Sequence, residues 1–242
     1  MSAESPLEIH DLTVAYHRKP VLWGVDLTVP AGQLIGIIGP NGAGKTTLFN
    51  LIAGDLRPDA GTIRFAGADV TALPTHRRCA AGIARTYQVP RPFENLTVFE
   101  TLLVGAVYGQ RKAERAVVDS CAEVLARTGL LDRTNRRAGT LTLLERKRLE
   151  LARALATGPR LLLLDEIAGG LTEGECHALV ETIQAIRAGG ITIVWIEHIV
   201  HALLAVVERL VVLDFGRKIA EGEPRAVMAS PEVQEIYMGI AA

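Results

Sequence analysis

The chain has 242 residues, 49% apolar and 22% charged, which is enough for one large α/β domain or two small ones. Its 26 Lys and Arg residues balance its 27 Asp and Glu residues, so no basic footprint for nucleic acid is expected. The three cysteines form no paired motif, which indicates reduced thiols. We expect no signal peptide, and no apolar run approaches the roughly 18 residues of a membrane span.

The N-terminal part of the chain predicts β-structure. Alternating apolar and polar residues between turn signals indicate short antiparallel strands over residues 7–36 and another at 62–65. Residues 34–38 form an unbroken run without polar side chains, which indicates a buried parallel strand.

A glycine-rich loop with the pattern G-x-x-x-x-G-K-[ST] follows this strand and precedes a predicted helix at 46–53. The N–H groups of this loop and the helix N-terminus are suited to bind a polyphosphate. Lys45 is expected to bind the β- and γ-phosphates, and the Thr46 hydroxyl is expected to bind Mg²⁺. The predicted nucleotide contacts in this loop are Gly39, Pro40, Asn41, Gly42, Ala43, Gly44, Lys45, Thr46 and Thr47. A glycine-rich turn with a chance lysine is the structural alternative.

Helices dominate the middle of the chain. A helix at 74–81 and a strand at 83–87 precede a mostly helical block at 95–157. Apolar residues that share one helix face in this block are Val117, Val118, Cys121, Val124 and Leu125.

Parallel-strand signals return at 161–164, 191–196 and 210–213. A helix at 173–188, opened by a Thr172–Glu175 capping box, separates the first two. Strands that alternate with helices imply a mostly parallel sheet, into which the helical block is inserted.

Two acids, Asp165 and Glu166, follow the apolar strand at 161–164. Since strand side chains alternate, the two are expected to point in different directions, one toward Mg²⁺ and one toward an attacking water. A strand that ends in Asp-Glu is often only the start of a loop, but the phosphate loop favours phosphoryl transfer.

The phosphate loop, the segment Leu161–Glu166 and the later Ile196-Glu197-His198 resemble an ABC-type ATPase domain over nearly the whole chain. The resemblance implies an α/β P-loop NTPase with a mostly parallel core sheet, an N-terminal antiparallel β subdomain and an inserted α-helical subdomain. It also implies one domain over 1–242, with a RecA-like core at about 1–88 and 158–242 and a helical subdomain at about 89–157.

The same resemblance implies ATP and Mg²⁺ as ligands and a role for each site residue. Tyr16 matches an aromatic residue that stacks on adenine in this family. Gln88 matches a glutamine that lies near Mg²⁺ and the attacking water, and His198 matches a switch histidine that contacts the γ-phosphate. The implied catalytic residues are Glu166, His198, Gln88 and Lys45, and the implied metal ligands are Thr46, Gln88 and Asp165. Each of the three matched residues has a purely structural alternative. Tyr16 is then a half-buried aromatic residue of a strand, Gln88 an ordinary loop glutamine and His198 a histidine at a strand end.

Two stretches, 85–105 and 222–239, resemble ATPase subunits of importers for branched-chain amino acids, urea or short amides, and the lipopolysaccharide exporter's ATPase is similar there. The resemblance implies a subunit at the cytoplasmic face of the cell membrane that docks on integral-membrane permease subunits. A solute-binding protein is expected in the complete system. The segment with Pro90, Pro92 and Phe93 is expected to be exposed and to meet the permease.

One motif departs from the family. Its signature reads Leu-Ser-Gly-Gly-Gln, whereas residues 141–145 read Leu-Thr-Leu-Leu-Glu, and the loop at 167–172 is also unusual. A Thr-x-x-Glu capping box still predicts the start of the helix, so Thr142 keeps a hydroxyl and a helix N-terminus aimed at a γ-phosphate across a dimer. However, leucine crowds the backbone and Glu145 adds negative charge near the phosphate. A heterodimer with a second ATPase subunit is therefore favoured, and a homodimer is the alternative.

Three other functions compete with an ATP-hydrolysing import subunit. A soluble ABC protein on ribosomes or DNA usually has tandem units or long insertions, which this chain lacks. A GTPase or small-molecule kinase has no role for His198, and no Asn-Lys-x-Asp motif is present. A subunit that binds ATP without turnover agrees with the altered signature but not with an intact Glu166.

Overall fold

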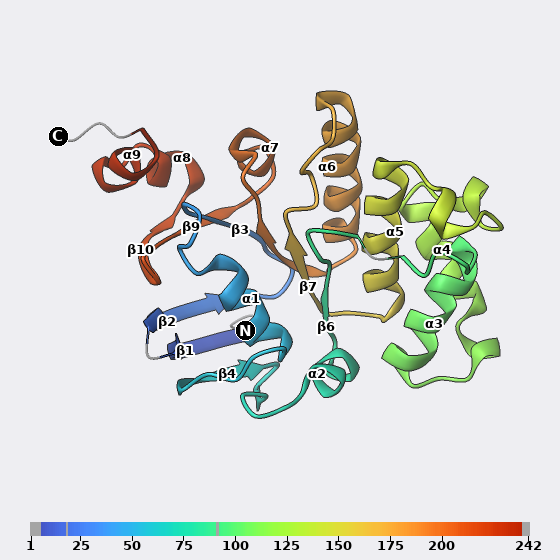
Figure 1. Ribbon diagram of the computed structural model, residues 1–242, viewed down its shortest axis with the longest axis horizontal. Helices are drawn as coiled ribbons and strands as arrows, with labels where there is room; N and C mark the ends of the chain where they lie inside the picture. Colours follow the sequence, from blue (N-terminus) through green and yellow to red (C-terminus); the bar gives the residue numbers. More distant parts are fainter. Residues whose placement is uncertain (1–5, 18, 91, 239–242) are drawn as a thin grey trace.

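A six-stranded sheet forms the centre of the computed structural model, which describes residues 6–17, 19–90 and 92–238 (Figure 1). Its strand order is β10-β9-β3-β8-β7-β6, and all neighbours run parallel except β10, which is antiparallel to β9. The strands are β3 (Leu34–Ile38), β6 (Ile83–Arg85), β7 (Leu161–Asp165), β8 (Thr192–Ile196), β9 (Arg209–Asp214) and β10 (Arg217–Gly222). This sheet confirms the predicted, mostly parallel core.

The N-terminal strands form a second, antiparallel sheet in the order β2-β1-β4-β5. Its strands are β1 (Leu7–Tyr16), β2 (Lys19–Val29), β4 (Ala60–Phe65) and β5 (Ala68–Asp69). The predicted helix after the phosphate loop is α1 (Lys45–Ala53), which ends at Gly54 in a left-handed conformation. Buried side chains of this sheet, of α1 and of the central sheet form one apolar cluster.

Helices α3, α4 and α5 lie between β6 and β7 in the sequence and form a lobe at one side of the molecule (Figure 1). They occur where a helical subdomain is predicted, and the boundaries given for it stay a prediction. The helices beyond α1 are α2 (Thr75–Ala81), α3 (Val98–Gln110), α4 (Val118–Arg127), α5 (Leu143–Ala156), α6 (Glu173–Ala188), α7 (Val200–Leu204), α8 (Pro224–Met228) and α9 (Pro231–Met238). Among the described residues, no helix has both the length and the apolar character needed to cross a membrane.

Two details of the sequence-based prediction are wrong. Strand β6 ends at Arg85 rather than at Tyr87, because the backbone pairing with β7 stops at Thr86, whose N–H donates to the carbonyl oxygen of Leu163. Val118 is exposed, although Val117 is buried. Neighbouring residues lie about 100° apart around a helix, so the apolar stripe of α4 excludes Val118.

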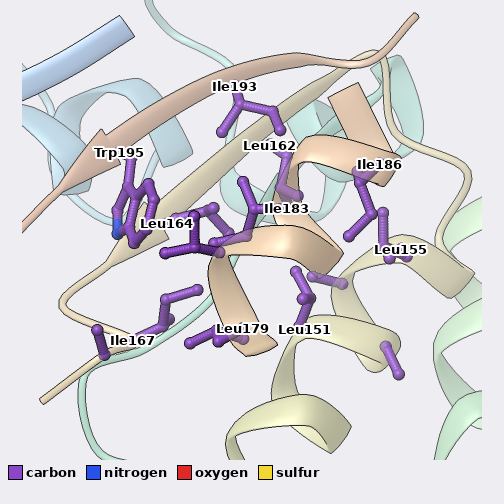
Figure 2. Close-up of a cluster of buried hydrophobic side chains, with 14 of the residues drawn as sticks. Leu151, Leu155, Leu162, Leu164, Ile167, Leu179, Ile183, Ile186, Ile193 and Trp195 are labelled. Carbon is purple, nitrogen blue, oxygen red and sulfur yellow. The ribbon is translucent and has the colours of Figure 1, made fainter. Parts of the chain in front are cut away.

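Different layers cover the two faces of the central sheet, which explains why its strands are apolar on both sides. In β7, Leu162 and Leu164 belong to a cluster with α5 and α6, whereas Leu161 and Leu163 belong to the cluster around α1. Figure 2 shows the first cluster, in which side chains from both helices point toward these strands. The strands are thus packed on both faces. Because β3, β8 and β7 run parallel, their carboxyl ends lie at the same edge of the central sheet.

A buried arginine on α2 ties that helix to the end of α1. The Arg78 guanidinium is fully buried and donates to the carbonyl oxygens of Leu51, Ile52, Thr71 and Leu73. Burial lowers the pKa of Arg78, and the nearby Asp55 and Asp69 oppose this effect. The side chain therefore satisfies carbonyls that α1 leaves open at its C-terminus.

We expect Arg78→Met to lower the free energy of unfolding by about 2–4 kcal/mol, because buried carbonyl groups lose their donors. For a chain of this size the melting temperature is then expected to fall by roughly 5–12 °C, as measured by thermal unfolding. Arg77→Met, at the exposed neighbouring position, is the matched control and is expected to change stability by less than about 0.5 kcal/mol. Equal effects of the two substitutions would contradict this role of Arg78.

Candidate functional site

The loop between β3 and α1 has glycine where the backbone leaves no room for a side chain. A Cβ atom on Gly39 would lie 2.1 Å from the carbonyl oxygen of Leu213, at the end of β9. Gly44 has a φ of 101°, and its Cβ atom would lie 2.6 Å from Cδ2 of Leu22. The two glycines therefore let the loop pass close to β9 and β2 and begin α1 directly at Lys45.

The Lys45 side chain turns back into this loop. Its Nζ donates to the carbonyl oxygens of Gly39 at 2.6 Å and Pro40 at 3.0 Å. Burial lowers the pKa of Lys45, and the carboxylates of Glu166 and Asp165 oppose this effect. The ammonium and the N-terminus of α1 together provide positive charge and free N–H donors, which are what a polyphosphate requires.

A cavity of about 370 Å³ opens beside the phosphate loop. Its lining residues are Tyr16, Val21, Asn41, Gly42, Ala43, Gly44, Lys45, Thr46, Thr47, Glu166 and His198. The structure thus brings Tyr16, Glu166 and His198, which are far apart in the sequence, to the loop. Tyr16, the last residue of β1, is 41% exposed, so its ring is accessible for stacking on a base.

A second cavity, of about 570 Å³, contains all three predicted metal ligands, Thr46, Gln88 and Asp165. Asp165 is buried, and its Oδ2 accepts a hydrogen bond from Nη2 of Arg85 at 2.6 Å. The same guanidinium donates to Oδ1 of Asn50 on α1 at 2.5 Å. Sequence analysis missed Arg85, although it lies in the Arg-Thr-Tyr-Gln segment that carries part of the resemblance.

Glu166 lies at the centre of a polar cluster formed by three separate segments. Its Oε1 is 2.7 Å from Nε2 of His198, and its Oε2 accepts a hydrogen bond from Nε2 of Gln88 at 2.5 Å. Its φ of 46° is strained for a residue other than glycine, a feature typical of functional sites. The carboxylate of Asp165 instead bonds to Arg85, which agrees with the expectation that the two acids point in different directions.

The altered signature forms the N-terminus of α5, which is capped by its own side chains. Thr142 caps α5, its backbone N–H donates to Oε2 of Glu145 at 2.9 Å, and its hydroxyl accepts from the Glu145 N–H. Glu145 also pairs with Nε of Arg133 at 2.6 Å. The hydrogen bond from Thr142 and the pairing with Arg133 lower the pKa of Glu145. Thr142 does not line the cavity beside the phosphate loop of its own chain.

Leu143 stands where the family signature has its first glycine, and its side chain is 46% exposed. A Cβ atom on Gly170, in the loop that follows β7, would lie 3.3 Å from Cδ2 of Leu143. The two segments that depart from the family pattern therefore face each other, with a leucine on one side and a glycine on the other.

The segment after Gln88 is less exposed than the sequence predicts. Of the three residues predicted to be exposed there, Pro90 and Pro92 are half-buried and Phe93 is exposed. The loop lies against α5, because Nζ of Lys147 donates to the carbonyl oxygen of Gln88 and the Arg153 guanidinium lies over the Phe93 ring.

An apolar groove of about 340 Å³ lies beside this segment, between α2, α3 and α5. Its exposed large side chains are those of Tyr87, Phe93, Val104 and Tyr108. Cys79 of α2 also lines it and is only partly buried, and burial raises the pKa of its thiol.

Comparison with known proteins gives consistent matches. Residues 22–169 match the ABC transporter family, and residues 217–242 match the family of branched-chain amino acid ATP-binding cassette transporters. The high-affinity branched-chain amino acid transport ATP-binding protein BraF of Pseudomonas aeruginosa is 35% identical, over 97% of this chain and 98% of the relative. The lipopolysaccharide export system ATP-binding protein LptB of Acidithiobacillus ferridurans is 34% identical, over 96% of each chain.

Solved structures agree with these matches. A nucleotide-free ATP-binding cassette from an ABC transporter superposes with a TM-score of 0.89 at 31% identity, over 98% of this chain and 100% of that chain. The ADP conformation of MJ1267, an ATP-binding cassette of an ABC transporter, has a TM-score of 0.89 at 32% identity, over 98% and 99% of the two chains. These similarities confirm the predicted fold class.

Proposed function

This chain belongs to the ABC transporter family as an ATP-binding subunit, and from this premise we propose that it hydrolyses Mg-ATP to power import of a polar solute. The proposed solutes are branched-chain amino acids or related amino acids, urea or amides. The relatives named for branched-chain amino acid transport and the match of the C-terminal segment support this choice.

The nucleotide is proposed to bind along the cavity beside the phosphate loop. The Tyr16 ring stacks on adenine, while the loop N–H groups and Lys45 bind the phosphates. Lys45 is held by two loop carbonyls, so binding requires its ammonium to exchange these for phosphate oxygens. The gain is that the ammonium then faces negatively charged phosphate oxygens in place of neutral carbonyl oxygens.

The second cavity has the oxygen donors that Mg²⁺ prefers. Thr46 contributes a hydroxyl, Gln88 an amide oxygen and Asp165 a carboxylate, and all three residues line this cavity. When bound, Mg²⁺ neutralises charge on the transferring phosphoryl group. Arg85 holds the Asp165 carboxylate in place for this role.

One observation carries the proposed hydrolysis: Gln88 and His198 both contact the carboxylate of Glu166, which lines the cavity beside the phosphate loop. The Glu166 carboxylate polarises the attacking water, the Gln88 amide orients that carboxylate, and the His198 imidazole touches the γ-phosphate. Phosphoryl transfer depends mainly on such positioning and charge stabilisation.

The proposed assembly has two ATPase subunits and two permease subunits at the cytoplasmic face of the cell membrane, with a solute-binding protein. The apolar groove between α2, α3 and α5 suits a permease segment because the aromatic side chains of Tyr87, Phe93 and Tyr108 are exposed along it. The self-capped end of α5 supports a heterodimer, since its N-terminus already holds the carboxylate of Glu145. A partner with an intact signature would complete the site on this chain.

The solute class is tested by uptake of radiolabelled leucine into vesicles that contain the complete transporter with this chain. We expect ATP-dependent uptake that stops when the chain carries Glu166→Gln, and competition by isoleucine and valine but not by aspartate. ATP-dependent movement of lipopolysaccharide out of the membrane, without leucine uptake, would instead support the exporter suggested by the similarity to LptB.

A further inference from the structure

A buried lysine on α5 contacts two of the catalytic loops at once. Lys147 is 4% exposed, and its Nζ donates to the carbonyl oxygen of Gln88 at 2.9 Å and to that of Glu166 at 3.3 Å. The side chains of these same two residues are hydrogen-bonded to each other. One ammonium therefore holds the backbone of both partners in the Gln88–Glu166 contact.

A buried carboxylate lies near this ammonium and holds the third catalytic loop. Glu197 is 2% exposed, its Oε1 accepts from the Ala168 N–H at 2.7 Å, and its Oε2 accepts from the His198 N–H at 3.1 Å. Burial lowers the pKa of Lys147, whereas the carboxylates of Glu197, Glu166 and Glu150 oppose this effect. Burial raises the pKa of Glu197, and hydrogen bonds from the backbone N–H groups of Ala168 and His198 oppose this effect.

The helix that carries Lys147 begins at the signature. Residues Thr142 and Glu145 form the first turn of α5, and Lys147 lies in the following turn. A movement of α5 toward or away from a partner's nucleotide would therefore move the anchor of Gln88 and Glu166. No other described ionisable side chain donates to both carbonyl groups.

We propose that Lys147 is a positioning residue for ATP hydrolysis, through which α5 sets the place of the Glu166 carboxylate and of its Gln88 partner. This inference rests on the proposed function of the site. Lys147 does not touch the nucleotide cavity, so its effect is on the rate of hydrolysis rather than on nucleotide affinity.

The structural part of the proposal is tested by hydrogen exchange of the full chain without nucleotide. Lys147→Met keeps the length of the side chain and removes the ammonium, so amide exchange at 86–90 and 166–170 is expected to rise about tenfold in both segments together. Arg78→Met is the matched control, because it also removes a buried cation bonded only to carbonyl groups. It is expected to raise exchange near 51–53 and 71–78 and to leave the two catalytic loops unchanged.

The catalytic part is tested by kinetics on the same variants. Lys147→Met is expected to lower kcat about tenfold with the ATP dissociation constant within about twofold, and Lys147→Arg to restore at least about a third of the rate. In a Glu166→Gln background, Lys147→Met is expected to have no further effect on single-turnover hydrolysis, since the two act through one group.

Unchanged exchange in either loop, or an equal loss of rate in the Glu166→Gln background, would overturn the proposal. A wild-type chain that neither binds nor hydrolyses Mg-ATP would overturn the proposed function and the kinetic role together. In that case the exchange experiment, which needs no nucleotide, still decides whether Lys147 holds the two loops.

Discussion

Glu166→Gln is expected to lower the rate of ATP hydrolysis about a thousandfold while ATP still binds. The amide has the shape of the carboxylate and keeps a donor and an acceptor for His198 and Gln88, which lie 2.7 Å and 2.5 Å from the Glu166 oxygens. It carries no negative charge, so it cannot polarise the attacking water. The phosphate loop and Tyr16 are unaltered, and the nucleotide affinity is therefore retained.

The rate is measured by single-turnover hydrolysis and the affinity by equilibrium binding of ATP. Glu123→Gln, at an exposed position on α4, is the control and should behave as the wild type. A Glu166→Gln variant that hydrolyses ATP within tenfold of the wild-type rate would show that another group activates the water. Weakened ATP binding would show instead that the substitution disturbs the loop.

The Glu166→Gln variant also tests whether the chain pairs with a second copy of itself or with a different ATPase subunit. Size-exclusion chromatography with and without Mg-ATP follows whether the blocked chain forms an ATP-dependent dimer. A dimer would mean that residues 141–145 still clamp a nucleotide and that the chain acts with a second copy of itself. A chain that binds ATP and stays monomeric would support a second ATPase subunit with an intact signature.

Restoring the signature is expected to raise hydrolysis by the chain alone about 10- to 100-fold. The triple substitution Leu143→Gly, Leu144→Gly and Glu145→Gln removes the exposed Leu143 side chain and the carboxylate that caps α5. The free N–H groups of the first helical turn then face a partner's γ-phosphate without a competing negative charge. One such charge-assisted hydrogen bond contributes roughly 1.5–3 kcal/mol, which gives this range of rates.

The measurement is the steady-state ATPase rate as a function of protein concentration, because a homodimer makes the rate rise more steeply than linearly. Leu131→Gly removes another exposed leucine of the same lobe and is expected to leave the rate unchanged. Glycine at the start of α5 costs about 1 kcal/mol per residue, so thermal unfolding is followed in parallel. A triple variant that stays folded without any gain in rate would show that the signature is not what limits the chain.

The amino-acid sequence by itself determined the local parts of this site. A strand, a G-x-x-x-x-G-K-[ST] loop and a helix follow one another without interruption, and the φ of 101° at Gly44 is one that glycine adopts readily. The capping boxes at Thr142 and Thr172 are likewise present where the sequence predicts them. Hydrogen bonds within four residues and side-chain periodicity decide these features, and both can be read from neighbouring residues.

The contacts among distant residues were decided only by the tertiary structure. Strand β8 lies between β3 and β7 although it follows both in the sequence, and this order brings His198 to Glu166 beside the phosphate loop. The pairing of Arg85 with Asp165 and the reach of Lys147 to two loops depend on the same packing. Periodicity shows that a strand is buried, but not which strand lies beside it, because that order is set by how all layers together bury their apolar faces.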